Sequence, residues 1–356
     1  MAMNKRLDFS GQSIFIGIDV HNKSWAVSIR TEQFEHKAFN QPPDPEVLAK
    51  YLKRNFPRAT YHAAYEAGHT GFWIYDKLVS LGVECSVIHP ADIPITDKDK
   101  RHKSDPRDCR RIASALKNGE LNPIYVPALK AREDRALIRE RMRLIQERTR
   151  IKNRVKSLLR FHGIAIPTQF TMRCWSQDFL EWLYSSNLMH SSSGKNALLS
   201  LVEQIRFYND QNLQITRKIR KLARGPRYKK DVDNLVTIPG IGIISAMVWL
   251  TELVDINRFK SFDKLACYIG LIPRERSSGE KQAVLGLDTR GNRILKTMLI
   301  ENSWAALRND PGMINAYQHL TQRMNGNRAI IRIARKLLRR IRYVLINEKT
   351  YQVGLA

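Results

Sequence analysis

Four acidic residues lie where a carboxylate needs a specific partner. Asp19 ends a short apolar run rich in β-branched residues, and Glu66 ends a second run just before Gly68. A carboxylate at the end of a buried strand is costly unless it binds a cation or accepts hydrogen bonds. Asp105 and Asp108 are three residues apart, so a helix would project both from one face. These four acids predict a site for two Mg²⁺ ions, which would stabilise the attacking and leaving oxygens of a phosphoryl displacement.

Each acid also has a purely structural explanation. Asp105 and Asp108 can cap the helix that they begin. Asp19 can cap a turn, and Glu66 can pair with a basic neighbour. The four acids together, in a strongly basic chain, favour the metal site over these separate explanations.

Two adjacent serines, Ser277 and Ser278, lie in the basic segment GLIPRERSSGEKQ. A serine is a weak nucleophile at neutral pH, but it can attack a phosphate that is held by cations. The alternative is a basic loop that touches phosphates without reacting.

A second candidate for phosphate contact is the glycine turn IPGIG, whose backbone N–H groups can approach a phosphate at a helix start. The alternative there is a tight turn between core helices. The candidate nucleic-acid contacts are Gly240, Gly242, Arg274, Arg276, Lys281 and Arg290.

The charge of the chain points to a polyanionic partner. The 356 residues include 60 Lys and Arg against 34 Asp and Glu, a formal net charge of +26. Phosphate backbones neutralise such an excess and release their counterions. A hydrophobic content of 43% excludes wholesale disorder. We find neither an apolar run of membrane-spanning length nor a secretory leader, and the four cysteines are scattered. These features predict a reduced cytoplasmic protein without a membrane partner.

The first 125 residues predict a mixed α/β sheet. Strands are expected at 13–20, 25–30 and 33–39, and then helices and strands alternate to residue 90. A polar loop at 91–103 leads into a helix over 104–119 that carries Asp105 and Asp108. This pattern places the acids on strand ends and on one helix.

The remainder of the chain is expected to be helical. Leu137, Leu144, Ile151 and Leu158 recur every seven residues, and a second apolar stripe runs over 198–222. The two stripes fit either a helical hairpin within one chain or a dimerisation arm. Residues 163–195 are expected to form an irregular connector. Helices follow from residue 231 onward, and the last, RAIIRIARKLLRRIRY, has a basic face that fits a nucleic-acid backbone or simply solvent.

These segments resemble a known family. GIDVH, YEAG and SDPRDCRRIA are similar to the RuvC/RNase H-like domain of the DEDD transposases of bacterial insertion sequences, relatives of the Piv/MooV DNA invertases. LVTIPGIGIISA, FKSFDKLACYIGLIPRERSSG and RGNRILKTMLIENSWAAL resemble the C-terminal transposase domain of that family, so the resemblance covers nearly the whole chain.

The resemblance implies an α/β + α architecture in three parts. Residues 1–128 would be the RuvC/RNase H-like DEDD catalytic domain, 129–228 a coiled-coil dimerisation or linker region, and 229–356 a mainly helical transposase domain with a helix-hairpin-helix-like turn. Asp19, Glu66, Asp105 and Asp108 would bind Mg²⁺, and Ser278 would be the nucleophile, with Ser277 as the second candidate.

The resemblance also implies partners and a reaction. A Mg²⁺-dependent recombinase would cleave, exchange and religate double-stranded donor and target DNA through a phosphoserine intermediate. A noncoding bridge RNA would guide it, dimers would assemble into tetramers, and the protein would associate with the bacterial nucleoid. Three alternatives remain at this point: a protein-guided site-specific invertase, a RuvC-like junction nuclease that uses water, and a nucleic-acid-binding protein without catalysis.

Overall fold

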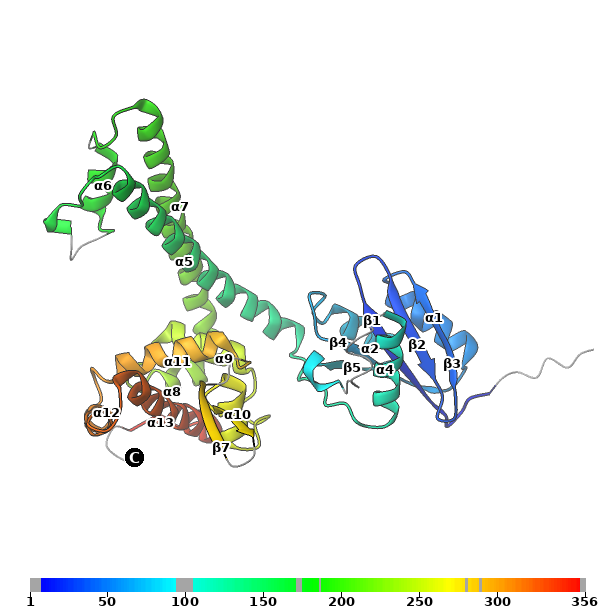
Figure 1. Cartoon of the computed structure of the whole chain (residues 1–356). Helices are drawn as coiled ribbons and strands as arrows, with labels where there is room; N and C mark the ends of the chain where they lie inside the picture. The colour runs from blue at the N-terminus through cyan, green and yellow to red at the C-terminus, as the bar shows by residue number, and fades with distance from the viewer. Residues whose placement is uncertain are drawn as a thin grey trace, which may run out of the picture. The chain divides into compact units, whose positions relative to one another are not determined.

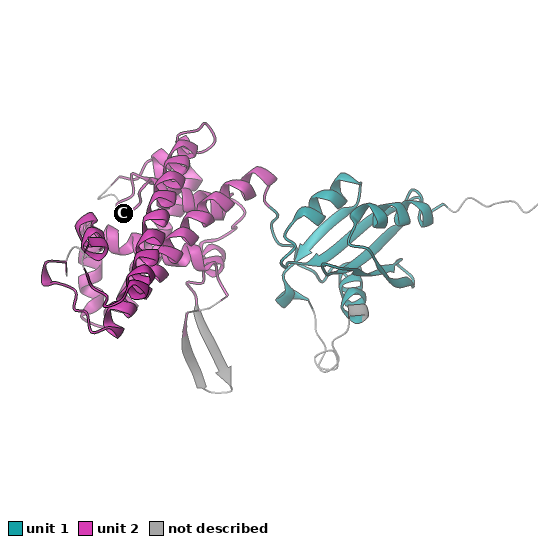
Figure 2. Cartoon of the chain, turned by 90° about the horizontal axis from the view of Figure 1, so that it is seen from above, with its two compact units in different colours: residues 1–126 teal, residues 127–356 magenta. Residues whose placement is uncertain are grey.

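A computed structural model describes residues 8–93, 105–170, 175–185, 187–278, 281–287 and 290–352, and for residues 105–106, 273–278 and 281–285 it gives the backbone alone. The chain divides into two compact units, residues 1–126 and residues 127–356 (Figure 2). Each unit is described by itself. Among the described helices, none combines the length and the apolar character that crossing a bilayer requires.

Unit 1 is built on a five-stranded mixed sheet in the order β3-β2-β1-β4-β5 (Figure 1). β1 pairs antiparallel with β2 and parallel with β4, while β3 and β5 extend the sheet at its two edges. The strands are β1 (Ser13–Val20), β2 (Trp25–Arg30), β3 (Glu35–Gln41), β4 (Thr60–Glu66) and β5 (Glu84–Ile88). The mixed sheet predicted for the first 125 residues is therefore confirmed.

Helices pack on both faces of this sheet. Leu48 of α1 (Pro45–Asn55) and Ile74 of α2 (Trp73–Ser80) share one core with the β1 isoleucines. Ile112 of α4 (Asp105–Lys117) packs with Ala64 and Ile88 in a separate cluster. A short 3₁₀ turn, η1 (Pro90–Asp92), follows β5. The loop expected at 91–103 lies outside the described residues from 94 onward.

Unit 2 begins with two long helices, α5 (Leu129–Phe161) and α7 (Ser192–Ala223), which pack against each other within the chain (Figure 1). Arg141 Nε donates to Thr216 Oγ1 at 2.9 Å, and an Arg148 N–H donates to Asn209 Oδ1 at 3.1 Å. Because the partner number falls as the α5 number rises, the helices run antiparallel. Both apolar stripes contribute buried residues to this contact: Ile151, Val155, Leu159, Leu198, Val202 and Ile205.

The segment between these helices is more ordered than expected. The sequence predicts an irregular connector over 163–195, whereas the structure has η2 (Thr168–Phe170) and α6 (Gln177–Ser185) there. Phe179 and Leu183 are buried against α5 and α7, and Phe170 and Trp182 pack their rings on Phe179. The expectation was wrong because serines and a proline flank a short aromatic helix whose burial depends on contacts distant in sequence.

The rest of unit 2 is a helical bundle around α9 (Ile243–Leu253), which is buried from Ser245 through Leu253. The other helices are α8 (Lys229–Leu235), α10 (Phe262–Ile269), α11 (Arg293–Ala306), α12 (Pro311–Thr321) and α13 (Gly326–Asn347). Between α10 and α11, β6 (Pro273–Ser278) and β7 (Lys281–Leu287) form an antiparallel two-stranded sheet. The expectation that strands are confined to the first 125 residues is therefore wrong, while the mainly helical character is confirmed.

Candidate active site

Two of the predicted acids lie at neighbouring strand ends. Asp19 is the penultimate residue of β1, and Glu66 is the last residue of β4. β1 and β4 are parallel, and Ile18 pairs with Tyr65, so the next residue along each strand is one of the two acids. The carboxyl ends of parallel strands are where α/β sheets place their ligand sites.

Both acids also face the side of the sheet that α4 covers. Ile16 and Ile18 of β1 pack into the core shared with α1 and α2, and side chains alternate along a strand. Asp19 therefore points to the opposite face. On β4, Tyr65 lies in the same α1 and α2 core, so Glu66 also faces α4 by this alternation.

A close approach at Gly17 brings α4 onto β1. A Cβ placed on Gly17 would lie 2.0 Å from the carbonyl oxygen of Cys109 and 2.5 Å from the amide nitrogen of Ala113. The helix thus crosses the strand in direct backbone contact, two residues before Asp19. Asp108, adjacent to Cys109, is only 8% exposed. This contact brings the first turns of α4 onto β1 near the strand end that carries Asp19, and no local sequence pattern marks Gly17 as the point of contact.

The charges around these acids are partly paired. Arg111, one helical turn after Asp108, donates to Asp108 Oδ1 at 2.8 Å. His21 Nε2 lies 3.3 Å from Asp19 Oδ2. Burial and the negative charge of Asp19 raise the pKa of the Cys109 thiol to about 11. The Asp19 carboxylate is therefore close enough to Cys109 to disfavour a second negative charge there, although burial is the larger cause of the raised pKa.

The donor chemistry of this edge fits Mg²⁺. Carboxylate oxygens are the ligands that this ion prefers, and Asp19 and Glu66 carry them at two neighbouring strand ends, while Asp108 carries them on α4. Asp105 begins α4, one turn before Asp108, and its side chain lies outside the described part. Among the side chains that are described, no three of His, Cys, Asp and Glu are close enough to share an ion.

The two serines end a β-strand. Ser277 and Ser278 are the last residues of β6, and Ser278 pairs with Lys281 at the start of β7. Only residues 279 and 280 connect the strands, which is the length of a tight hairpin turn. The side chains of Ser277, Ser278, Arg274, Arg276 and Lys281 lie outside the described part, whereas Arg290 is exposed after β7. The sequence signal that was missed is a glycine, Gly279, between a polar segment and the more apolar segment that forms β7.

The base of this hairpin is fixed by buried polar contacts. Glu252 of α9 is fully buried and accepts two hydrogen bonds from Arg139 of α5, at 2.7 and 2.9 Å. It also accepts one from Asn292 Nδ2 at 3.0 Å, and Asn292 caps α11 directly after the hairpin. Burial alone would raise the pKa of Glu252, but these hydrogen bonds and the charges of Arg139 and Arg135 lower it. This cluster was not anticipated, because Glu252 is 113 residues from Arg139 and 40 residues from Asn292 along the chain.

The glycines of the IPGIG turn have different environments. Gly240 has φ +89°, and a Cβ there would lie 2.4 Å from the carbonyl oxygen of Asn302 on α11. Gly242 caps α9, is exposed, and has open space where a Cβ would stand. Its N–H donates to Ser245 Oγ at 3.0 Å. Gly240 therefore serves helix packing, and Gly242 is the glycine that presents the α9 start to solvent.

Family models of transposases match segments of both units. A model of DEDD transposases of the IS110 type, described as Transposase, matches residues 16–164, and a model described as Transposase IS116/IS110/IS902 family matches residues 232–318. A putative transposase of Sinorhizobium fredii, y4qE, is 29% identical over 82% of this chain and 71% of its own length. The transposase for insertion sequence element IS1111A of Coxiella burnetii is 26% identical over 81% of this chain and 78% of its own length. The chain belongs to the IS116/IS110/IS902 family of transposases.

Proposed function

We propose that this transposase is a metal-dependent DNA recombinase whose carboxylate site is built on β1, β4 and α4. The observation that carries the proposal is the meeting of Asp19 and Glu66 at adjacent parallel strand ends, on the face that α4 crosses at Gly17. Asp108 and Asp105 complete the set from α4. Bound Mg²⁺ would supply charge neutralisation at the scissile phosphate.

The fold of unit 1 supports this assignment. Three antiparallel strands followed by two parallel ones, in the order β3-β2-β1-β4-β5, fit a RuvC/RNase H-like domain. In this proposal residues 1–128 form the catalytic domain and residues 129–228 the coiled-coil dimerisation or linker region. Residues 229–356 form the transposase domain with the helix-hairpin-helix-like turn and the nucleophile.

The chemical step would belong to Ser278, with Ser277 as the second candidate. The serine Oγ attacks the scissile phosphorus and loses its proton, while the bond from phosphorus to the leaving sugar oxygen breaks and that oxygen gains a proton. One phosphodiester is exchanged for another, so no water is consumed. The protein–DNA ester is then open to attack by the hydroxyl of a new strand, which religates the DNA and frees the serine.

Substitution of the carboxylates tests the metal site. Asp108→Asn and Glu66→Gln should lower strand cleavage in Mg²⁺ by at least about 100-fold. Both variants should keep their affinity for DNA, because binding depends on the basic surface. Glu46→Gln is the matched control, since Glu46 lies on α1 and pairs with Lys77 on the other side of the sheet. Normal cleavage by Asp108→Asn would overturn the site.

We also propose a noncoding bridge RNA as guide and a dimer that assembles into a tetramer. A charge of +26 suits sequence-independent contact with phosphates, which leaves recognition of the DNA sequence to base pairing. Sequencing the RNA that copurifies with protein expressed beside its flanking DNA tests the guide. One discrete transcript from that flank is the expected result, and a smear of cellular RNA would favour a protein-guided invertase.

A further inference from the structure

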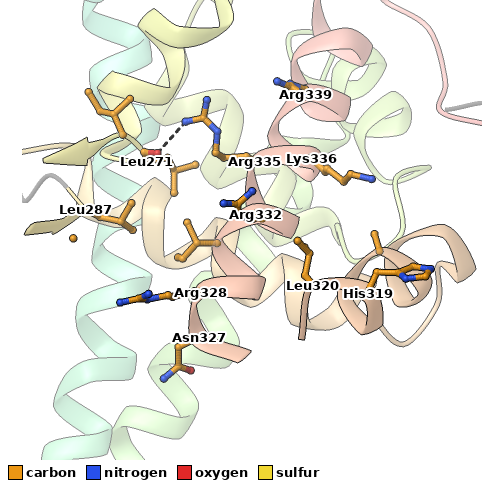
Figure 3. A pocket seen from close by; sticks show the side chains of 14 residues that line it. Leu271, Leu287, His319, Leu320, Asn327, Arg328, Arg332, Arg335, Lys336 and Arg339 are labelled. Atoms are coloured by element: carbon orange, nitrogen blue, oxygen red, sulfur yellow. Dashed lines mark hydrogen bonds between the residues drawn. The ribbon is translucent and has the colours of Figure 1, made fainter. Parts of the chain in front are cut away.

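A groove lies at the base of the serine hairpin, between the hairpin, α12 and α13 (Figure 3). It has a volume of about 950 Å³. Leu271 precedes β6 and Leu287 ends β7. The two ends of the hairpin, which we call its feet, therefore both contribute to the apolar lining of the groove. α12 contributes Leu320 and His319 on the other side (Figure 3).

One rim of the groove is strongly basic. Arg328, Arg332, Lys336 and Arg339 recur along α13 at steps of four, four and three residues, and all four are exposed. Among the described residues that line the groove, none is acidic. Figure 3 shows Arg328 and Arg332 extending from α13 toward Leu271 and Leu287. This row therefore presents its charges to the groove.

Arg335 has a different role from its neighbours. One of its N–H groups donates to the Leu271 carbonyl oxygen at 3.0 Å, and its guanidinium reaches Asp263 at 3.4 Å. It also lies over the ring of Phe262. Arg335 thus ties α13 to the first foot of the hairpin, while Arg328, Arg332 and Lys336 have no carboxylate partner among the described side chains.

The floor between the basic rim and α12 is apolar. Leu271, Leu287, Leu320 and Ile331 line it. Basic side chains beside an apolar surface suit a strand whose phosphates meet the charges and whose bases lie on the apolar side chains. A duplex would meet the charges but keep its bases stacked inside, and would leave this floor uncovered.

We propose that the groove binds an unpaired strand of DNA that flanks the serine. The row from Arg328 to Arg339 spans about 16 Å of helix, which matches about five phosphates at B-form spacing and fewer in a stretched strand. Ile272 lies at the groove just before β6, and Ser278 ends β6, so six extended residues separate them by about 20 Å. The groove therefore holds nucleotides several positions away from the reacting phosphate and keeps the broken strand in place. The proposal rests on the proposed function in taking DNA as the ligand and Ser278 as the reacting residue.

A binding measurement without Mg²⁺ tests the groove independently of the chemistry. The probe is a fluorescent oligothymidylate of about 15 nucleotides. The triple variant Arg328→Gln, Arg332→Gln, Lys336→Gln should weaken binding of the full-length protein about tenfold or more and flatten the salt dependence by about two units of log–log slope. The control Arg217→Gln, Arg220→Gln, Lys221→Gln removes the same three charges from the exposed face of α7 and should change affinity by less than about twofold.

A second measurement examines the apolar floor. An abasic oligonucleotide keeps the phosphates and removes the bases, so wild-type protein should bind it several-fold more weakly than oligothymidylate. Leu320→Ser should reduce this preference, and its melting temperature reports whether the fold is kept. The proposal would be overturned if the variant with Arg328, Arg332 and Lys336 replaced lost as much affinity for duplex DNA as for oligothymidylate. It would also be overturned if the α7 control variant lost as much affinity for oligothymidylate as that triple variant. Tighter binding of RNA than of DNA of the same sequence would also overturn it.

The two proposals fail separately. Suppose that the triple variant of the groove loses affinity for oligothymidylate but wild-type protein forms no serine adduct with DNA. The groove proposal is then supported, and the proposed serine chemistry is wrong. If the adduct forms on wild-type protein and the triple binds oligothymidylate normally, the serine chemistry stands and the groove is wrong.

Discussion

Gly17 and Cys109 are in direct backbone contact, with only 2.0 Å between the Cys109 carbonyl oxygen and the place where a Cβ on Gly17 would stand. Real Cβ contacts are not this short, and the obstacle is the helix backbone itself, which cannot change rotamer. The contact therefore sets how closely α4, which carries Asp108, approaches β1, which carries Asp19. In the proposed metal site, a glycine without catalytic chemistry would thus determine the spacing of the acids.

Gly17→Ala should therefore damage both fold and activity. Separating α4 from β1 costs roughly 1–3 kcal/mol of unfolding free energy and moves Asp108 away from the strand ends. Chemical denaturation and a cleavage assay measure the two effects. Gly68→Ala is the control in the same unit, because its nearest contact would be at 4.0 Å. Full activity of Gly17→Ala would show that the close approach does not position the acids.

Substitutions of Gly240 and Gly242 in the IPGIG turn should have different effects on stability. Gly240→Ala places a side chain at φ +89° and against the α11 backbone, so unit 2 should lose roughly 3 kcal/mol or more of unfolding free energy. Gly242→Ala meets open space and should cost about 1 kcal/mol or less.

The same pair tests the proposed phosphate contact at the start of α9. The added methyl of Gly242→Ala projects where a phosphate would approach the first N–H groups of the helix. Duplex DNA affinity should fall several-fold in this folded variant. An unchanged affinity would mean that the glycine serves the turn alone.

Glu252 should make unit 2 sensitive to acid. Its pKa lies below the ordinary value of 4.5, because the contacts from Arg139 and Asn292 outweigh the effect of burial. The folded state therefore gains stability from the ionised carboxylate above the ordinary pKa, and this gain is lost as the pH falls through the lowered pKa.

Glu252→Gln isolates this contribution. The variant should be less stable than wild type by roughly 3 kcal/mol at neutral pH, since Arg139 loses its charged partner. The difference in unfolding free energy between the two proteins should narrow as the pH falls below 4.5 toward the lowered pKa, where folded wild type also loses the charge. Denaturation curves across this range provide the measurement, with Asp263→Asn as an exposed control. A gap that stays constant with pH would contradict the lowered pKa.

The sequence predicted local structure well where side chains encode it locally. SIFIGIDV and WAVSIR are β-branched runs that end at turns, and the structure has β1 and β2 there. Pro106 in the first turn and Gly119 after the last likewise predict α4. The acids could be placed on these elements for the same reason.

Contacts between distant segments were not predictable. No local pattern shows that α4 crosses β1 at Gly17, or that Glu252 meets Arg139 across 113 residues. The hairpin β6–β7 was missed because β6, PRERSS, carries polar and charged residues in succession after its proline, so no alternating apolar face marks it as the partner of the more apolar β7, KQAVLGL. The single-strand groove depends on segments from α12, α13 and both hairpin feet, which only the fold brings together.

The proposed serine mechanism is tested most directly by identifying the residue to which DNA becomes covalently attached. Wild-type protein, incubated with its element's junction DNA in Mg²⁺ and denatured in detergent, should carry a DNA strand on Ser278 in peptide mapping by mass spectrometry. Asp108→Asn should yield no adduct. Cleaved DNA without an attached protein would show hydrolysis by water and contradict the serine mechanism, and an adduct on Ser277 would contradict the choice of Ser278.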